Sequence, residues 1–336
     1  RSQKDRKNLE EESSLKVSGP LCALVALQTS PLGDVASDQH RAKADVRTAH
    51  WSRAVVQQAA LLARLPQASR LSVELASEKG ASSWLTTLPV TELGFHLNKS
   101  EFRDGLCLRY NWPLRYLPSH CACGHALSVE HALSCAVGGL PSQRHNHIRD
   151  LTATLLTEVA TNVGVEPRLL PLSGESLRLR SANTDDEARL DIEAYGFWGS
   201  HHERALFDVR VFNPFARSYA TTPIATNYRR HEQAKVREYE QRVREIERAS
   251  FTPLVFSATG GMAPRARVFY KKLSDRLSAQ RTENYSRTIA LVRAMLNFSL
   301  LRDAIASLRG ARSSRGRFGC FVASVDVAVT ESRVEV

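Results

Sequence analysis

Two apolar stretches, 188–194 and 205–212, constrain the fold of this chain more than any other feature, because each has an aspartate at its centre. In the first stretch the apolar residues alternate, so that they share one face of a strand and leave Asp191 and Glu193 on the other. The second stretch is apolar at nearly every position, which is typical of an interior strand. Asp208 is costly there unless a neighbouring group neutralises it.

The spacing of the two aspartates predicts how the strands pair. The midpoint between Asp191 and Asp208 falls between Gly199 and Ser200, and Gly-Ser is suited to a two-residue hairpin turn. About that turn the aspartates lie opposite each other, with Cβ atoms about 5 Å apart. Like charges so placed repel unless a cation lies between them, and paired carboxylates suit Mg²⁺ or Mn²⁺. The alternative is a bulged hairpin out of register, with one buried and one solvent-facing aspartate.

A highly charged helix is predicted over about 227–249, downstream of the hairpin. Two tyrosines, a glutamate and a lysine recur there at helical spacing, with His231 beside them: Tyr228, Glu232, Lys235 and Tyr239. A lysine near paired carboxylates can stabilise charge on a phosphate under attack. The simpler interpretation is a surface ion pair between Glu232 and Lys235, which are three residues apart.

A second site is predicted upstream, where three cysteines and a histidine fall within a short segment: Cys121, Cys123, His131 and Cys135. Such a set of nitrogen and sulfur ligands suits tetrahedral structural Zn²⁺. The Cys-x-Cys spacing is tighter than the usual Cys-x-x-Cys, so His120 or His125 is an alternative ligand. Reduced cysteines without a metal are the simpler interpretation. The remaining cysteines lie among apolar neighbours and are expected in the core: Cys22, Cys107 and Cys320.

The charge of the chain favours a polyanionic partner. Its formal net charge is +11 and its pI is about 9.6, and arginine, which pairs in a two-pronged way with phosphate, outnumbers lysine. Arg144, His145 and Asn146 follow the cysteine cluster and lead into an amphipathic helix predicted over 147–163, where phosphate could meet the helix N-terminus. The predicted nucleic-acid-binding residues are Arg144, His145, Arg210 and His231. No apolar run approaches the ~20 residues of a membrane-spanning helix.

The predicted order of elements is helix, strands, helix, strand and helix, which describes an α/β domain with an antiparallel hairpin in its middle. Further helices are predicted over 41–64, 100–110 (capped by Ser100), 263–278 and 284–308, and a strand over 252–257. We expect a helical connector over 1–115, a zinc knuckle over 116–145, the α/β domain over 146–310 and a flexible tail over 311–336. The whole is expected to be a piece of a longer protein.

As a set, these motifs resemble the restriction-like endonuclease region found downstream of the polymerase in certain site-specific non-LTR retrotransposons. The matching segments are Cys121–Cys135, Arg144-His145-Asn146, Ala188-Arg189-Leu190-Asp191, Phe207-Asp208-Val209-Arg210-Val211 and His231-Glu232-x-x-Lys235-x-x-x-Tyr239. The resemblance covers roughly residues 80–280. It implies a restriction-endonuclease-like core of the diverged PD-(D/E)xK type, with a mixed sheet flanked by helices. It also implies Asp191 and Asp208 as metal-binding carboxylates and Lys235 as the catalytic lysine.

The chain departs from that pattern at two positions. Leu190 precedes Asp191 where the pattern has proline, and Arg210 stands where its simplest form has lysine. Arginine stays protonated and is a poor substitute in proton handling, so the resemblance assigns that role to Lys235. Further metal contacts are expected from Glu158 or Glu193. No aromatic-x-Asp-Asp polymerase motif is present, since Asp185 and Asp186 lie in a polar turn, and residues 1–115 are expected to be the connector from a polymerase.

The function expected from the sequence is metal-dependent hydrolysis of a DNA phosphodiester in the nucleus, nicking target DNA for insertion of a mobile element. The expected partners are the DNA backbone and the element's RNA. One alternative is a decayed remnant that binds nucleic acid without cutting it, with which Arg210 and the missing proline agree. The other is a host nuclease of the same fold that repairs DNA or resolves junctions.

Overall fold

The computed structural model describes residues 35–179, 188–219 and 221–310. The predicted tail, Cys22, Cys320, Asp185 and Asp186 lie outside these described residues. The chain divides into two compact units, 1–61 and 62–336. Helix α2 (Val35–Arg64) makes up the described part of the first unit and confirms the helix predicted over 41–64.

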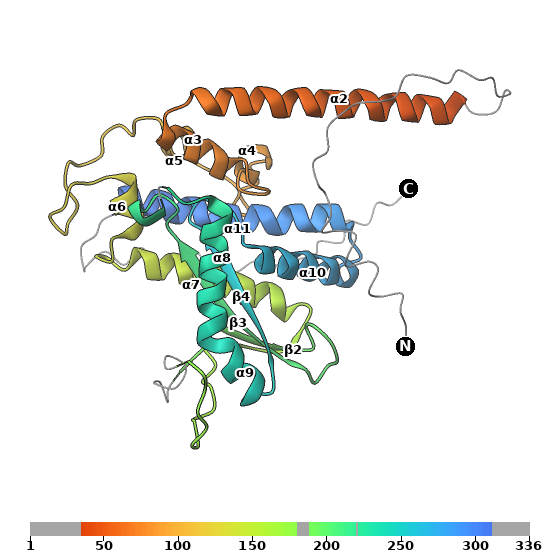
Figure 1. Ribbon diagram of the computed structural model, residues 1–336, viewed down its shortest axis with the longest axis vertical. Coiled ribbons are helices and arrows are strands. Elements are labelled where there is room, and N and C mark those ends of the chain that lie inside the picture. The colour runs from red at the N-terminus through yellow and green to blue at the C-terminus, as the bar shows by residue number, and fades with distance from the viewer. Residues whose placement is uncertain (1–34, 180–187, 220, 311–336) are drawn as a thin grey trace. The chain divides into compact units, whose positions relative to one another are not determined.

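Four strands of the second unit form one mixed sheet in the order β1-β2-β3-β4 (Figure 1). Their bounds are β1 (Thr161–Val165), β2 (Ile192–Tyr195), β3 (Arg204–Phe212) and β4 (Ser250–Ser257). The pairs β1–β2 and β2–β3 are antiparallel, whereas β3 and β4 are parallel and therefore need a crossover connection. The predicted α/β class and the central antiparallel hairpin are confirmed.

The hairpin has the predicted register but not the predicted turn. Ile192 pairs with Phe207, as predicted, but the ladder ends there. The amide of Asp191, directly before β2, donates to the Phe207 carbonyl at 3.2 Å, so Asp191 and Asp208 are neighbours without being a ladder pair. The strands part after Tyr195, and residues 196–203 connect them, in place of a two-residue Gly-Ser turn. The cause is Phe197, whose fully buried ring packs 5.7 Å from the ring of Phe207 and so draws the connection into the core.

Helices cover one face of the sheet in two layers. Helix α7 (Leu140–Thr157) and α10 (Pro264–Gln280) pack against the strands, and α11 (Tyr285–Arg309) packs behind them. The core they enclose is apolar throughout, with Phe207 and Phe269 rings 4.9 Å apart at its centre. The helices predicted over 263–278 and 284–308 are thereby confirmed, including the buried stripe of the second.

A single helical run covers the opposite face and provides the crossover from β3 to β4. It consists of α8 (Ile224–Lys235), a π-helical turn, η4 (Val236–Glu240), and α9 (Gln241–Glu245). A short 3-10 turn, η3 (Arg217–Tyr219), precedes it. The predicted helix is confirmed, and its π-helical turn begins directly after Lys235. Such turns occur frequently at functional sites, because they alter the direction of the side chains around them.

The predicted helix over 147–163 is wrong at its C-terminal end. Helix α7 stops at Thr157, and the chain then enters β1, where Asn162 has a φ of +48° that no α-helix accommodates. Val159 and Val163 pack against the same core as the helix, which explains their apolar spacing. Pairing of β1 with β2 therefore outweighs the local helical pattern.

The predicted domain boundaries do not separate compact units, since residues from 62 onward form one unit. Three helices of the predicted connector lie within it: α3 (Gln67–Ala76), α4 (Ser83–Thr86) and α5 (Lys99–Tyr110). Helices α4 and α5 pack on α11, and α3 packs on α5. The apolar cluster at α11 includes Phe95, from the segment between α4 and α5, whose ring stacks 5.1 Å from that of Phe298. The boundary predicted between 145 and 146 falls inside α7. The cap of α5 is Asn98, in a capping box with Glu101, and not Ser100.

Candidate functional site

Asp208 and Lys235 form a buried ion pair at the centre of the sheet. Asp208 is only 4% exposed, and the Lys235 Nζ lies 3.0 Å from its Oδ2 and 3.2 Å from its Oδ1. The Tyr239 ring lies 5.1 Å from the same ammonium group and helps to hold it. The predicted surface pair between Glu232 and Lys235 is wrong, because Glu232 is buried and accepts a hydrogen bond from the Arg265 amide.

Asp191 lies directly before β2, next to Val209 of β3, and both of its carboxylate oxygens have hydrogen-bond partners. The Val209 amide donates to Oδ2 at 2.6 Å, and His145 Nε2 lies 2.9 Å from Oδ1. His145 comes from α7, so this contact fixes Asp191 against the helix on the other side of the strand. His145 was predicted to bind nucleic acid. No spacing in the sequence connects it with Asp191, which lies 46 positions away.

The positive charge of Lys235 does not fully offset the cost of burying the Asp208 carboxylate. Burial raises the pKa of Asp208 to about 6, against the attraction of Lys235, and the neighbouring Asp191 raises it further. Its Oδ2 accepts no hydrogen bond of good geometry from any described residue, although the Lys235 ammonium is near. Two neighbouring carboxylates, one of them buried, form a site whose repulsion a divalent cation can relieve.

The further carboxylates predicted to contact a metal are engaged elsewhere. Glu193 pairs with Arg204 at 2.8 Å, and Glu158 pairs with Arg281 at 2.6 Å. Glu158 and Glu193 are thus engaged in ion pairs, and a metal contact from either stays a prediction. The carboxylate site consists of Asp191 and Asp208, with Lys235 and His145 beside them.

The raised pKa of Asp208 predicts how stability changes with pH. Its folded pKa of about 6 lies above its unfolded value of 3.8, so the folded chain holds this proton longer than the unfolded chain. The stabilisation is complete below the unfolded pKa and is lost as the pH rises through 6. Relative to Asp208→Asn, which does not titrate, the wild-type free energy of unfolding should fall by about 3 kcal/mol between pH 4 and 7. Urea unfolding in Mg²⁺-free buffer measures this difference, and one that stays constant with pH would contradict it.

The other three residues predicted to bind nucleic acid differ in how far they are exposed to solvent. Arg144 is only 2% exposed and donates to the Leu133 carbonyl, so its predicted contact with phosphate is wrong. Arg210 is exposed, two positions along β3 from Asp208 and on the same face. His231 is hydrogen-bonded to the Tyr219 hydroxyl at 2.9 Å. Burial, with the Arg210 charge, lowers the pKa of His231 to about 4, so at neutral pH it offers phosphate no positive charge.

Tyr228, which shares one face of the helix with Glu232, Lys235 and Tyr239, serves packing. The Tyr228 hydroxyl donates to Glu78 Oε2 at 2.8 Å, which joins the end of α3 to α8. Burial raises the pKa of Glu78 to about 7, although this hydrogen bond opposes the shift. Of the four residues on this face of the helix, Lys235 and Tyr239 are thus the two that lie at Asp208.

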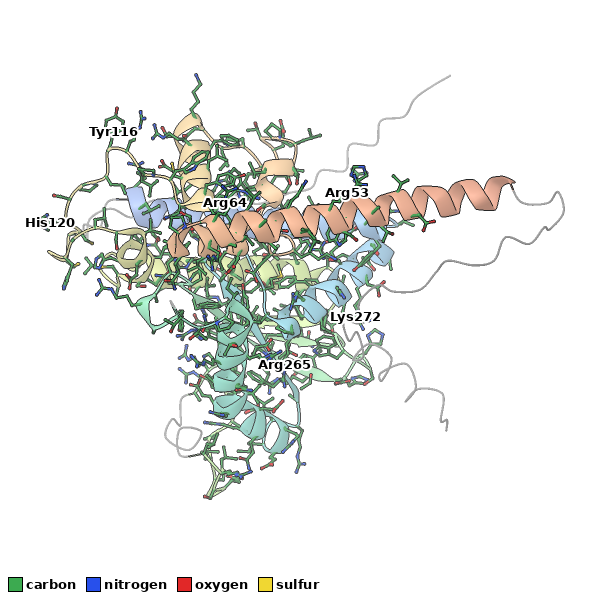
Figure 2. All side chains as sticks on the ribbon, turned by 45° about the horizontal axis from the view of Figure 1, so that its top comes forward. Arg53, Arg64, Tyr116, His120, Arg265 and Lys272 are labelled. Carbon is green, nitrogen blue, oxygen red and sulfur yellow. The ribbon has the colours of Figure 1, made fainter. Side chains whose placement is uncertain are left out.

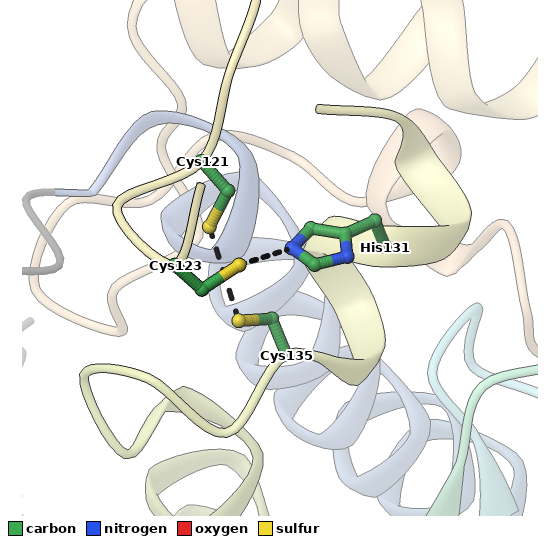
Figure 3. A group of neighbouring side chains, drawn as sticks. All are labelled: Cys121, Cys123, His131 and Cys135. Carbon is green, nitrogen blue, oxygen red and sulfur yellow. Dashed lines mark hydrogen bonds between the residues drawn. The ribbon is translucent and has the colours of Figure 1, made fainter. Parts of the chain in front are cut away.

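The three cysteines and the histidine of the predicted knuckle converge (Figure 3). Their ligand atoms all lie within 4.8 Å of one another. Cys121 Sγ is 3.8 Å from Cys135 Sγ, and Cys123 Sγ is 3.2 Å from His131 Nε2. A tetrahedral zinc site with Zn–S bonds of about 2.3 Å has sulfur atoms about 3.8 Å apart, so the thiol pair already has that spacing. Among the described residues this is the one such cluster of three or more ligands, and it could hold a metal ion such as zinc.

The local backbone explains the convergence. Residues 119–127 turn back on themselves through a bridge between His120 and Ala126, with Gly124 at a φ of +86° in the bend. The short helix α6 (Val129–Ser134) follows, capped by Ser128, and carries His131 one turn before Cys135. Both ligands therefore face the loop from the same side of the helix.

The structure favours His131 over the alternative histidine ligands. His120 Nδ1 lies 3.0 Å from the Ser119 hydroxyl, outside the cluster. His125 is beside it, with Nδ1 3.4 Å from Cys123 Sγ and its ring stacked on that of His131. Burial alone would raise the pKa of Cys121, but hydrogen bonds within the cluster, first from the Cys123 backbone, lower it to about 6. The Cys107 thiol is buried in the core, as predicted.

Two neighbouring residues of α7 connect the metal cluster with the carboxylate site. Arg144 donates to the carbonyl of Leu133, which lies in α6 between His131 and Cys135. His145, the next residue, contacts Asp191. The N-terminal part of α7 therefore holds the helix that bears two of the cluster's ligands and also one of the paired aspartates.

Comparison with known proteins adds no relative to these observations: no family model matches the chain, and no curated protein matches it in sequence. Within the described residues, no helix is both long enough and apolar enough to cross a membrane.

Proposed function

We propose that this chain is a divalent-metal-dependent endonuclease that hydrolyses a DNA phosphodiester in the nucleus, as the nicking component of a mobile element. One observation carries the proposal. The Asp191 carboxylate accepts a hydrogen bond from the Val209 amide, next to Asp208 on β3, and the Lys235 ammonium contacts the buried Asp208. Two carboxylates and a lysine converging on a sheet are suited to phosphoryl chemistry at a metal ion. A mixed sheet with helices on both faces is also what a restriction-endonuclease-like core would require.

Asp191 and Asp208 would hold Mg²⁺ or Mn²⁺, which would offset the charge repulsion between the two carboxylates. The bound ion would supply Lewis-acid polarisation of the phosphate and a lowered pKa for an attacking water. Lys235 is placed to stabilise charge that develops on the phosphate oxygens, and the Tyr239 ring and Asp208 hold it there. His145 and the Val209 amide orient Asp191.

The DNA partner is supported by charge. The chain has a formal net charge of +11, and Arg210 is exposed on the same face of β3 as Asp208. Arg210 would hold the phosphate backbone next to the carboxylates. Affinity for duplex DNA should therefore fall steeply with added salt, because each neutralised phosphate releases counterions.

Nicking of supercoiled plasmid in the presence of Mg²⁺ tests the proposal. We expect the purified chain to produce nicked circles, Asp191→Ala to abolish them, and Lys235→Ala to slow nicking by about 10²-fold or more, because a group that stabilises transition-state charge is lost. Lys272→Ala is the matched control, since Lys272 is a partly exposed lysine on α10 paired with Asp275. Equal activity of Lys235→Ala and Lys272→Ala would exclude Lys235 from the site.

A further inference from the structure

An exposed aromatic platform lies between α5 and the metal cluster, in the segment 110–116. Tyr110, Trp112 and Tyr116 are 37%, 55% and 86% exposed. The rings of Tyr110 and Trp112 stack 5.0 Å apart, and the Arg109 guanidinium lies 5.4 Å from the Tyr110 ring. The rings of Tyr110 and Trp112 are therefore presented at the surface, next to a half-buried Arg109 that donates to the Ala76 carbonyl and the Ser82 hydroxyl.

The backbone under the platform is fixed by several hydrogen bonds. Asn111 ends α5 with a φ of +54°, and the Trp112 amide donates to the Cys107 carbonyl at 2.9 Å. Tyr116 has a φ of +59°, and its carbonyl accepts a hydrogen bond from Arg309 at 3.1 Å. Left-handed conformations of such residues persist only where the surroundings enforce them, and they cluster at ligand-binding positions. The rings are therefore exposed on a pre-organised loop, and binding would cost little ordering entropy.

The charge around the platform has one sign. The sequence from 105 to 129 contains no aspartate or glutamate, but it contains Arg109, Arg115 and His120. Figure 2 shows Tyr116 and His120 on the same protruding segment. The acidic residue that comes just before this segment in the sequence, Asp104, is buried and paired with Arg309 at 2.7 Å. Exposed rings on a segment that carries the exposed Arg115 and no carboxylate are complementary to the bases and phosphates of a nucleic acid.

We infer that this platform binds single-stranded DNA by stacking unpaired bases on Trp112 and Tyr116. In a duplex the faces of the bases are already stacked, so free aromatic rings select unpaired bases, whatever their identity. The choice of DNA over RNA rests on the proposed function, because a nick creates DNA strand ends whose terminal bases can fray and unpair. The stacking itself is independent of that function.

Fluorescence anisotropy with a labelled oligothymidylate of about 20 nucleotides tests the inference, with a duplex of equal length and an oligouridylate as comparisons. We expect Trp112→Ala and Tyr116→Ala each to weaken binding of the oligothymidylate about tenfold. Trp112→Phe should retain most of the affinity, because a stacking ring remains. Affinity for the duplex should change less than about twofold, and nicking of plasmid should be unchanged. Tyr285→Ala is the matched control, since Tyr285 is 39% exposed at the start of α11.

Three results would overturn the inference: equal losses for single-stranded and duplex DNA, equal losses for Tyr285→Ala, or tighter binding of the oligouridylate. A chain that fails to nick but loses single-strand affinity on Trp112→Ala would refute the endonuclease while leaving the platform intact. If an alanine variant does not fold, photo-crosslinking of the wild-type chain to an iododeoxyuridine oligonucleotide decides. Crosslinks at Trp112 or Tyr116 support the platform, and crosslinks only elsewhere overturn it.

Discussion

Replacing Asp208 by asparagine is expected to lower the rate of Mg²⁺-dependent nicking by at least about 10³-fold while changing affinity for duplex DNA by less than about twofold. The substitution keeps the shape of the side chain but removes the charge that faces Asp191 and Lys235. Asp208 is 4% exposed, so it contributes little to the surface that holds the DNA backbone. Cleavage and binding should therefore separate cleanly in this variant.

Plasmid nicking and duplex anisotropy, measured on the same preparation, check this separation. Asp275→Asn is the matched control, because Asp275 is an exposed aspartate on α10 and should leave both quantities unchanged. Mg²⁺ should also raise the thermal midpoint of the wild-type chain but not that of Asp208→Asn, since a ligand bound only by the folded state stabilises it. Undiminished nicking by Asp208→Asn would remove Asp208 from the proposed site.

The same measurements distinguish the two alternative functions. A wild-type chain that binds duplex DNA but never nicks it, with or without Mg²⁺ or Mn²⁺, would be the decayed remnant. Preferential cleavage of branched over linear DNA would favour a host junction-resolving nuclease. In the remnant the ion pair of Asp208 with Lys235 would be only structural, whereas in a junction-resolving nuclease of the same fold it would belong to the active site. The platform at Trp112 is tested separately.

The sequence predicted the hairpin register and the metal cluster because both follow from short-range patterns. A strand has a period of two, so a one-residue slip would have turned the apolar residues next to Asp191 and Asp208 to the wrong face. The cysteines and His131 lie within one loop and one helical turn, where spacing limits geometry strongly. The approach of Lys235 to Asp208 required only that its helix cross the adjacent face of the sheet.

What the sequence could not predict depends on contacts between distant segments. The burial of Arg144 and the contact of His145 with Asp191 follow from where α7 packs, and neither residue type nor spacing encodes that position. The end of α7 depends on the pairing of β1 with β2, which outweighs an apolar spacing typical of a helix. A two-residue Gly-Ser turn would have left Phe197 in a paired strand, yet it lies in the connection and is fully buried. Local patterns therefore gave the candidate residues, whereas packing decided which of them meet.

Removing the metal from the Cys/His cluster is the second large effect expected. We predict that the purified chain contains one equivalent of zinc and that His131→Ala and Cys123→Ser lose it, because each removes one of the four converging ligands. Binding free energy at such a site is also folding free energy, so the thermal midpoint should fall by roughly 10 °C on loss of the metal. Metal content by mass spectrometry and thermal unfolding measure the two effects.

His120→Ala is the matched control for His131→Ala, since His120 lies one residue before Cys121 but points to Ser119. It should retain the zinc and the wild-type midpoint. Equal metal loss in both variants would mean that the loop, and not the histidine at position 131, determines binding. A chain purified without any metal, with cysteines that react fully with thiol reagents while the fold is intact, would contradict the site altogether.

Loss of the metal should also reach the carboxylate site, although no cluster ligand belongs to it. Without the ion, α6 loses the constraint that holds His131 and Cys135 together, and the Leu133 carbonyl no longer holds Arg144 in place. Arg144 would then be a buried cation without its acceptor, which favours displacement of the first turns of α7. Because His145 orients Asp191 from that part of the helix, nicking should decline together with zinc content in His131→Ala and should persist in His120→Ala.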